Sequence, residues 1–192
     1  MSEYQYYQFL AVEQPLSKRQ QGELRTLSSR AQITADRMLN HYEWGDFKGD
    51  PVTLVERYFD AHLYFANWGS RRLVLRVPAA HVALETVLPY CREDVLSAHR
   101  SGAHVIIDMT SEDEEGKEGW WVREADWDDE DDHGVLGELI GIRDELSRGD
   151  MRPLALACLA SATVGPHGRT KDMPDALTAP QRALAAFLRV TG

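Results

Sequence analysis

Aromatic side chains concentrate in one stretch of this sequence, residues 42–77, and this concentration constrains the fold more than any other feature. The chain has five Trp, seven Tyr and five Phe, and eight of these 17 residues lie between Tyr42 and Trp68. Aromatic side chains bury more apolar area than any others, so a cluster of them marks the centre of a core or of an interface. We therefore expect the rest of the chain to be organised around this stretch.

Within this stretch, Asp50 and Pro51 predict the start of a helix. Asp is a favoured N-cap residue, and Pro at the first helical position loses no N–H that the helix needs. Apolar residues at spacings of three and four extend the predicted helix from about residue 52 to residue 66. Residues 71–77 follow as a predicted strand with one dry face and one wetter, positive face. The dry face carries Leu73, Leu75 and Val77, and the other carries Arg72, Val74 and Arg76.

The remaining elements predict an α+β fold. Strands are expected within residues 4–12, 33–44 and 103–110, with 119–123 as a hairpin partner, and helices at 17–29, between Pro78 and Pro89, at 134–147, at 150–164 and from 178 onward. The strands alternate apolar with polar residues, which argues against an all-parallel sheet buried on both faces. We expect a two-layer sandwich with a mixed four- to five-stranded sheet. Residues 1–133 would form this domain, and residues 134–192 a helical section packed on it or leading to a further C-terminal region.

The net charge of −10 comes from one segment of the chain. Residues 112–132 hold 12 acidic and two basic residues, which leaves 19 of each sign elsewhere. The acids fail the spacing of an EF-hand, and consecutive acids in one loop point in different directions, unlike the carboxylates of a two-metal site. We interpret the segment as a solvated acidic loop, and we expect no metal and no cofactor. The local acidity indicates that this one segment avoids phosphates, and the remaining surface is not excluded as a binder. Three arginines near Trp68 are weak evidence for nucleic acid, so we do not expect a nucleic-acid partner.

Reactive motifs are absent from the sequence. There is no Gly-x-Ser-x-Gly, no P-loop and no Gly-x-Gly-x-x-Gly. The spacing His99-x4-His104-x3-Asp108 could supply metal ligands, but no His-Glu-x-x-His or Cys-x-x-Cys accompanies it. His62 adjoins the apolar stripe of the predicted central helix, and we interpret it as a core or rim histidine with a hydrogen-bonded ring.

The setting predicted for this chain is the cytoplasm. Its two cysteines, Cys91 and Cys158, are far apart in sequence and suggest no disulfide framework. The N-terminus has no basic region followed by an apolar one, so a signal peptide is not expected. No apolar run approaches the roughly 18 residues of a membrane span, so we expect no membrane partner.

Candidate binding residues combine arginine with tryptophan, the residue types enriched at interface hot spots. The best basic-aromatic patch has Arg71, Arg72 and Arg76 near Trp68, and it suits a carboxylate, a phosphate or an acidic segment of a partner. The acidic loop would instead engage a basic partner. The full set of candidate binding residues is Trp44, Lys48, Trp68, Arg71, Arg72, Arg76, Asp128, Asp129, Asp131 and Asp132. No catalytic residue is named, and the oligomeric state stays open.

Several sequence segments resemble a family of uncharacterised bacterial proteins. The distinctive ones are the segments 6–9 (YYQF), 27–34 (LSSRAQIT), 44–50 (WGDFKGD) and 57–69 (RYFDAHLYFANWG). No activity is established for that family, so the resemblance implies no catalytic residue here. Its members extend beyond the point where this chain stops, which would make the chain an N-terminal portion or a short member.

Two hypotheses of function follow from the sequence. The first is a non-catalytic protein-interaction module or a subunit of a larger bacterial assembly. The alternative is a hydrolase-like enzyme with a dispersed site, in which His41, Glu43, Asp46 and Asp50 supply acid and base groups beside the 41–50 loop. A cavity at that loop, lined by at least two of these four residues, would favour the enzyme.

Overall fold

The structure is a computed structural model that describes residues 4–43, 45, 47–112, 134–162 and 176–190. Its strands are β1 (Gln5–Leu10), β2 (Gln32–Ile33), β3 (Arg37–Tyr42), β4 (Ala61–Ala66), β5 (Ser70–Pro78), β6 (Leu96–Ser101) and β7 (His104–Glu112). Its α-helices are α1 (Lys18–Leu27), α2 (Pro51–Arg57), α3 (Leu84–Val87), α4 (Gly134–Leu139), α5 (Gly141–Ser147), α6 (Arg152–Ala162) and α7 (Ala179–Leu188). A 3-10 turn, η1 (Leu88–Tyr90), follows α3.

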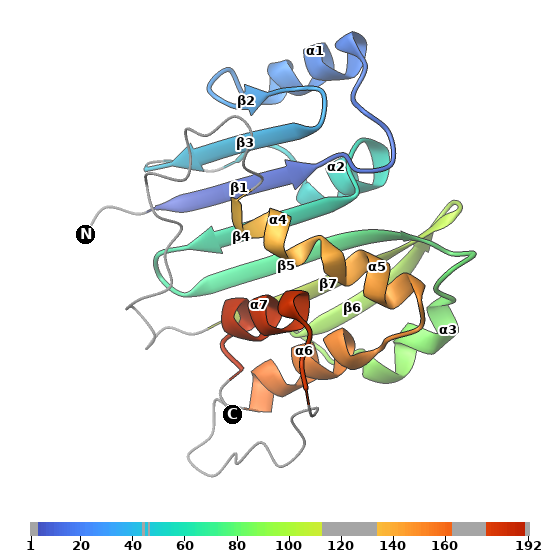
Figure 1. Cartoon of the computed structure of the whole chain (residues 1–192). Coiled ribbons are helices and arrows are strands. Elements are labelled where there is room, and N and C mark those ends of the chain that lie inside the picture. Colours follow the sequence, from blue (N-terminus) through green and yellow to red (C-terminus); the bar gives the residue numbers. More distant parts are fainter. Residues whose placement is uncertain (1–3, 44, 46, 113–133, 163–175, 191–192) are drawn as a thin grey trace.

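The described strands form one antiparallel sheet in the order β2-β3-β1-β4-β5-β7-β6 (Figure 1). The α+β class predicted from the sequence is therefore confirmed, whereas the mixed sheet of four to five strands is corrected to seven antiparallel strands. Two strands account for most of the difference. The predicted central helix ends early and is followed by β4, and the polar edge strand β6 has no counterpart among the predicted elements.

The division of the predicted helix 52–66 has a physical reason. Asp50 caps α2 as expected, accepting a hydrogen bond from the Thr53 amide at 2.9 Å, but α2 ends at Arg57. From Ala61 onward the chain pairs with β1 on one side and β5 on the other. Leu63, which fits the helical spacing, fits the two-residue alternation of a strand equally well. The long-range ladder hydrogen bonds therefore decide between the two periodicities.

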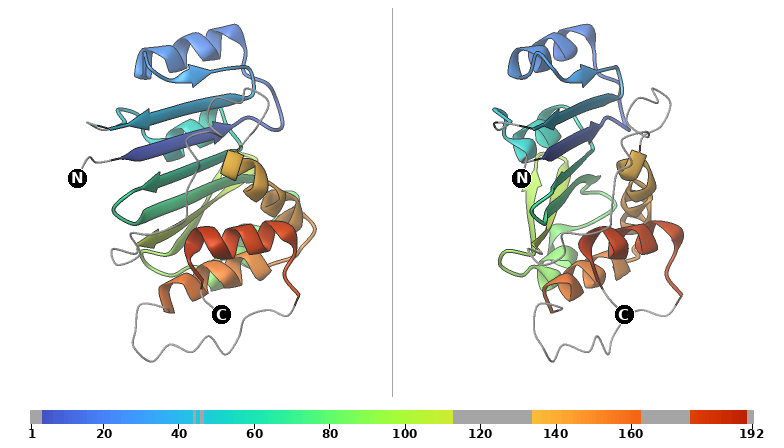
Figure 2. Two further views of the ribbon diagram at one scale, coloured as in Figure 1. Left: turned by 60° about the vertical axis from the view of Figure 1, so that its left-hand side comes forward. Right: turned by 90° about the vertical axis from the view of Figure 1, so that its left-hand side faces the viewer.

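Helices cover both faces of the sheet, which corrects the two-layer expectation. Helices α4 to α7 pack on the first face, where they share one hydrophobic core with inward residues of the strands (Figure 2). Helices α1 and α2 pack on the second face, with Leu24 and Val55 in a separate core around Phe9 and Val74. The predicted capping boxes at Ser17 and Thr178 are present at the starts of α1 and α7.

The second face is only partly covered by its two helices. Phe9, Val74 and Ile106, which lie under α1 and α2, are completely buried. Toward the other end of the strands, Tyr64, Arg72 and Thr110 keep part of their surface exposed. These side chains project from the second face because they alternate in register with the buried ones. The uncovered part of this face is where the candidate site lies.

Candidate functional site

A cavity of about 460 Å³ opens on the uncovered part of the second face, and we call it the tyrosine cavity. Strands β1, β4, β5 and β7 form its floor. One side is closed by Phe47 and Gly49 of the loop before α2 and by Pro51, the first residue of α2. Gly49 is needed there, because a Cβ atom at this position would lie 2.7 Å from the Phe47 ring. The volume lies in the range of about 300–1,000 Å³ that is typical of sites for small ligands.

Tyrosines form the wall of this cavity, and a glutamine holds them in place. The hydroxyl groups of Tyr7 and Tyr64 donate to Gln5 Oε1 at 2.8 and 3.2 Å, and their ring centroids are 4.8 Å apart. Gln5 Nε2 donates to the Gly45 carbonyl at 3.1 Å, which connects the wall to the loop. The Phe47 ring continues the wall at 5.1 Å from the Tyr7 ring. Rings held in this way offer a large contact area at a low cost in entropy.

His62 lies on the floor of the cavity and is completely buried. Its ring stacks on Phe9 with centroids 4.1 Å apart, and its Nδ1 lies 3.0 Å from the Gln8 carbonyl oxygen. Burial lowers the pKa of His62 from its ordinary 6.5 to about 3, so the ring is neutral near pH 7. A carbonyl oxygen only accepts, so Nδ1 carries the proton and Nε2 is an acceptor. No residue in the described part of the chain donates to Nε2.

Arg72 supplies a positive group to the same cavity. Its Nε and Nη2 donate to the two carboxylate oxygens of Asp108 at 2.9 and 2.6 Å. These hydrogen bonds raise the pKa of Arg72, which keeps it charged. The fork geometry fixes the guanidinium plane and leaves Nη1 without a hydrogen bond to any described residue. The Arg72 side chain is 31% exposed, so a ligand can reach it.

Trp68 lies beside the rim of the cavity. Its Nε1 donates to Ser70 Oγ at 2.9 Å, and Ser70 Oγ donates to Glu112 Oε2 at 2.6 Å. Ser70 and Glu112 both line the cavity. Trp68 is 38% exposed, one of the few large apolar side chains of the described chain that reach solvent. The candidate binding residue Trp68 therefore lies next to the tyrosine cavity, and its indole N–H is hydrogen-bonded to Ser70.

The three predicted binding arginines do not form one patch. Arg71 is buried and alternates to the side of β5 opposite Arg72. Arg76 shares the face of Arg72 but lies under the covered part, where its Nε and Nη2 donate to Asp60 Oδ1 at 3.1 and 2.7 Å. Arg71 and Arg72 both line the tyrosine cavity and Arg76 does not, and Arg72 is the more exposed of the two. The alternation of the strand, together with partners from distant elements, separates residues that are close in sequence.

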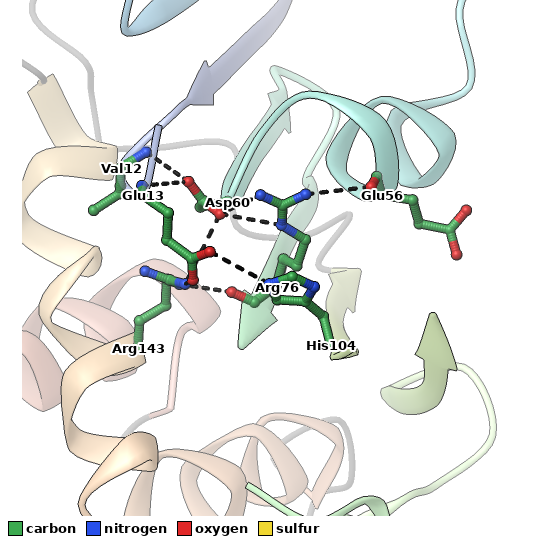
Figure 3. Close-up of polar contacts among 7 residues, drawn as sticks. All are labelled: Val12, Glu13, Glu56, Asp60, Arg76, His104 and Arg143. Carbon is green, nitrogen blue, oxygen red and sulfur yellow. Dashed lines mark hydrogen bonds and ion pairs between the residues drawn. The ribbon is translucent and has the colours of Figure 1, made fainter. Parts of the chain in front are cut away.

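Asp60 is the centre of a buried charge cluster that we call the clamp, shown in Figure 3. Its carboxylate is 1% exposed and accepts from the amides of Val12 and Glu13 at 2.6 and 2.8 Å as well as from Arg76. Arg143, from α5, donates to the Arg76 carbonyl at 2.6 Å and pairs with Glu13. The clamp ties α5, on the first face, to the sheet and to the loop after β1. Its groups are satisfied by one another, which gives it a structural role.

Of the residues proposed for an enzymatic site, the three that the structure describes, His41, Glu43 and Asp50, do not line the tyrosine cavity. Its described lining comes from the 41–50 loop only through Phe47 and Gly49. His41 and Glu43 are exposed, and the Asp50 carboxylate caps α2. Its hydrogen bonds with Thr53 lower the pKa of Asp50. Lys48 and Asp50 border a separate hollow beside α2.

Six predicted site residues lie outside the described part of the chain: Trp44, Asp46, Asp128, Asp129, Asp131 and Asp132. The binding role of the four aspartates and of Trp44, and the acid–base role of Asp46, stay predictions. The hairpin strand expected at 119–123 lies outside the described residues as well.

The histidines and aspartate of the possible metal spacing contact three different groups. His99 Nε2 lies 2.8 Å from Glu56 Oε1, His104 Nε2 lies 3.3 Å from Glu13 Oε2, and Asp108 pairs with Arg72. Within the described residues, no group of three His, Cys, Asp or Glu side chains is placed to hold a metal ion. Burial raises the pKa of the Cys91 and Cys158 thiols, which disfavours the thiolate that nucleophilic catalysis needs.

Two of the site residues could have been found from the sequence, since His62 and Tyr64 alternate in the segment that becomes β4. Tyr7 and Gln5 come from β1, more than fifty positions away, and only the pairing of β1 with β4 brings them there. No family model, no curated protein and no solved structure matches this chain. The resemblance to an uncharacterised bacterial family stays a prediction. Among the described helices, none has the length and apolar character needed to cross a membrane.

Proposed function

We propose that this protein is a non-catalytic protein-interaction module and that its partner contacts the tyrosine cavity and the adjoining Trp68. The observation that carries the proposal is the cavity itself, with a wall of ordered tyrosines on a sheet face that α1 and α2 leave uncovered. Tyrosine, tryptophan and arginine are the residue types that anchor interfaces. All three types are present here in Tyr64, Trp68 and Arg72.

The chemistry of the lining favours binding over catalysis. The buried His62 ring has a pKa of about 3, so it is a poor base at neutral pH, where a general base works best with a pKa near the working pH. Arg72 is held by Asp108, and no cysteine is among the described lining residues. The groups that remain suit recognition of a shape, an aromatic ring and an acceptor or anionic group.

The acidic segment gives this module a second feature. We expect Asp128, Asp129, Asp131 and Asp132 to attract a basic region of the partner, which would speed the encounter more than it strengthens the final complex. The partner is thus a protein that offers one group to the cavity and positive charge to the segment. We expect this interaction in the cytoplasm, in keeping with two cysteines that carry thiols.

The proposal is tested by capturing partners with a protein whose cavity is filled. Thr110 lines the cavity and is partly exposed, so Thr110→Trp fills the space without disturbing the buried core. Thr86, exposed on α3, provides the matched control Thr86→Trp. Tagged wild type and both variants would be purified from the source cells, partners identified by mass spectrometry, and affinities measured with purified partner.

We expect at least one partner to bind wild type and Thr86→Trp equally and to bind Thr110→Trp at least tenfold more weakly, a difference of about 1.4 kcal/mol. A partner that binds all three proteins equally would contradict a role for the cavity. A protein that is recovered alone in every purification, at low and high salt, would contradict the interaction function.

A further inference from the structure

We propose that the tyrosine cavity holds an aromatic side chain with a ring donor, tryptophan or tyrosine, whose N–H or O–H group donates to His62 Nε2. The inference rests on the proposed function, since it names the group of the partner that enters the cavity. Three features of the described residues lead to it: an unsatisfied acceptor on the floor, aromatic rings on the wall and an unused donor of Arg72 at the same cavity.

The acceptor on the floor is the strongest of these features. His62 is completely buried, and its ring is fixed by the Gln8 carbonyl on one edge and by the Phe9 ring on one face. Nε2 is therefore held in one place with its lone pair unused by any described residue. Leaving a buried acceptor unsatisfied is destabilising. Because Nε2 is fully buried, a ligand reaches it by displacing a neighbouring side chain. A ligand that brings a donor then satisfies the acceptor, whereas a ligand that brings an acceptor meets a second lone pair.

The wall selects a planar, apolar body for the group that carries the donor. Tyr7, Phe47 and Tyr64 line the space, and contacts between aromatic rings are favourable beyond the area that they bury. A ring with one N–H or O–H at its edge meets both the wall and the floor. Among protein side chains, tryptophan and tyrosine have this combination.

Arg72 indicates which chemical group of the ligand lies next to its aromatic ring. Two of its nitrogens are occupied by Asp108, and Nη1 has no hydrogen bond to a described residue. Since Arg72 and His62 line the same cavity, a ligand with its ring over His62 can place a carboxylate on Nη1. We therefore expect an acidic group close to the aromatic residue of the partner.

Two ligands that differ in one hydrogen-bond donor test the inference on the wild-type protein. N-acetyl-tryptophan and its 1-methylindole analogue have nearly the same shape, but the second has no ring N–H. We expect the first to bind about tenfold more tightly in a calorimetric or NMR titration, as is typical for the loss of one hydrogen bond to a buried acceptor. The amide N-acetyl-tryptophanamide, which has no carboxylate, should bind more weakly than the acid, and this difference reports on Arg72.

A pair of variants assigns the preference to His62. His62→Phe keeps a ring on Phe9 but has no acceptor, and it should bind both indoles equally. Tyr64→Phe is the matched control, because it removes a hydroxyl from the same cavity and leaves His62 intact; its preference for the N–H indole should persist. In protein with ¹⁵N-labelled histidine, the His62 Nε2 resonance is identified as the one that His62→Phe lacks. In wild type this resonance should shift on binding of the N–H indole, and it should not shift on binding of the methylated indole.

Three results would overturn the inference. These are equal binding of the two indoles to wild type, survival of the preference in His62→Phe, and no detectable binding of either ligand. The result of this test can be distinguished from the result of the partner-capture test of the proposed function. Indole binding with no recovered partner would contradict the interaction function alone, and a partner that requires an open cavity but binds His62→Phe as well as wild type would contradict this inference alone.

Discussion

Side chains alternate between the two faces of the sheet, and the two faces are covered to different extents. On the first face, helices α4 to α7 cover Leu73, Leu75 and Val77 so completely that none of the three is exposed. On the second face, α1 and α2 cover only the part around Phe9 and Val74, and tyrosines with their hydroxyl groups paired take over where the helices end. The cavity therefore arises because helices cover only part of the second face of the sheet.

Two acid–arginine pairs differ in the same way, one being buried and the other partly exposed. The Asp60–Arg76 pair is almost entirely buried, and Arg143 of α5 adds to it from the first face. In the Asp108–Arg72 pair the arginine donates to both carboxylate oxygens, whereas Arg76 donates twice to one oxygen of Asp60. The Asp108–Arg72 pair lies at the cavity, with both side chains partly exposed. A buried pair holds elements together because breaking it leaves a charge in a dry place, whereas an exposed pair contributes little to stability. One arginine pair therefore serves the fold, and the other is available to a ligand.

The largest effect that we expect is on the pH dependence of unfolding, and it comes from His62. Its pKa is about 3 in the folded protein and about 6.5 when unfolded, so the unfolded chain takes up the proton first as the pH falls. The stability is full above about pH 6.5 and decreases toward pH 3, by up to about 5 kcal/mol from this group.

Urea unfolding at a series of pH values measures this effect, with His62→Phe as the comparison. Between pH 6.5 and 3 the variant should lose less stability than wild type. Equal slopes would mean that His62 is accessible to protons in the folded protein, and the description of the cavity floor would then be incorrect.

The next effect separates the two acid–arginine pairs. Asp60→Asn keeps the size of the side chain but leaves Arg76 without its counter-charge and Arg143 with Glu13 alone, and we expect a loss of about 3–5 kcal/mol in the free energy of unfolding. Asp108→Asn is its counterpart at the cavity and should cost about 1 kcal/mol or less. Chemical denaturation of both variants gives the comparison. Similar losses would show that the two pairs do not differ in the way described.

Shortening one side chain on each face of the sheet tests how firmly that face is covered. Leu139 of α4 is completely buried in the first core, and Leu139→Ala should cost about 2–5 kcal/mol because it leaves a cavity in a packed region. Thr110→Ala at the tyrosine cavity should change the stability by no more than about 0.5 kcal/mol. Thermal unfolding of both variants is sufficient, and a small loss for Leu139→Ala would mean that α4 is not firmly packed.

The smallest effect on stability is expected in the acidic segment. Changing Asp128, Asp129, Asp131 and Asp132 together to Asn removes repulsion between neighbouring charges, so the fold should remain intact. Stopped-flow association with a basic partner should become slower and less dependent on salt, because screening acts over about 8 Å at physiological ionic strength. Unfolding of this variant, or loss of a bound divalent metal, would show instead that the segment is a structural or metal site.

Local features of the sequence determined the ends of helices and the inward faces of several elements. Ser17, Asp50 and Thr178 cap helices where they were expected, and Gly149 follows α5 with φ +86°. Leu136, Leu139, Ile142 and Leu146 are all completely buried, as their spacing predicts. These features are readable because capping hydrogen bonds and helical periodicity involve residues only a few positions apart.

Tertiary structure alone decided the number of strands and the composition of the site. Residues 61–66 satisfy both a helical and a strand periodicity, and only the ladders to β1 and β5 make them a strand. That pairing puts Tyr7 beside Tyr64 and the Gln8 carbonyl beside His62. The partners of Arg72 and Arg76 likewise come from positions 36 residues later and 16 residues earlier. Local sequence cannot specify such contacts, because the hydrogen bonds and charges that select them belong to strands that meet only in the folded chain.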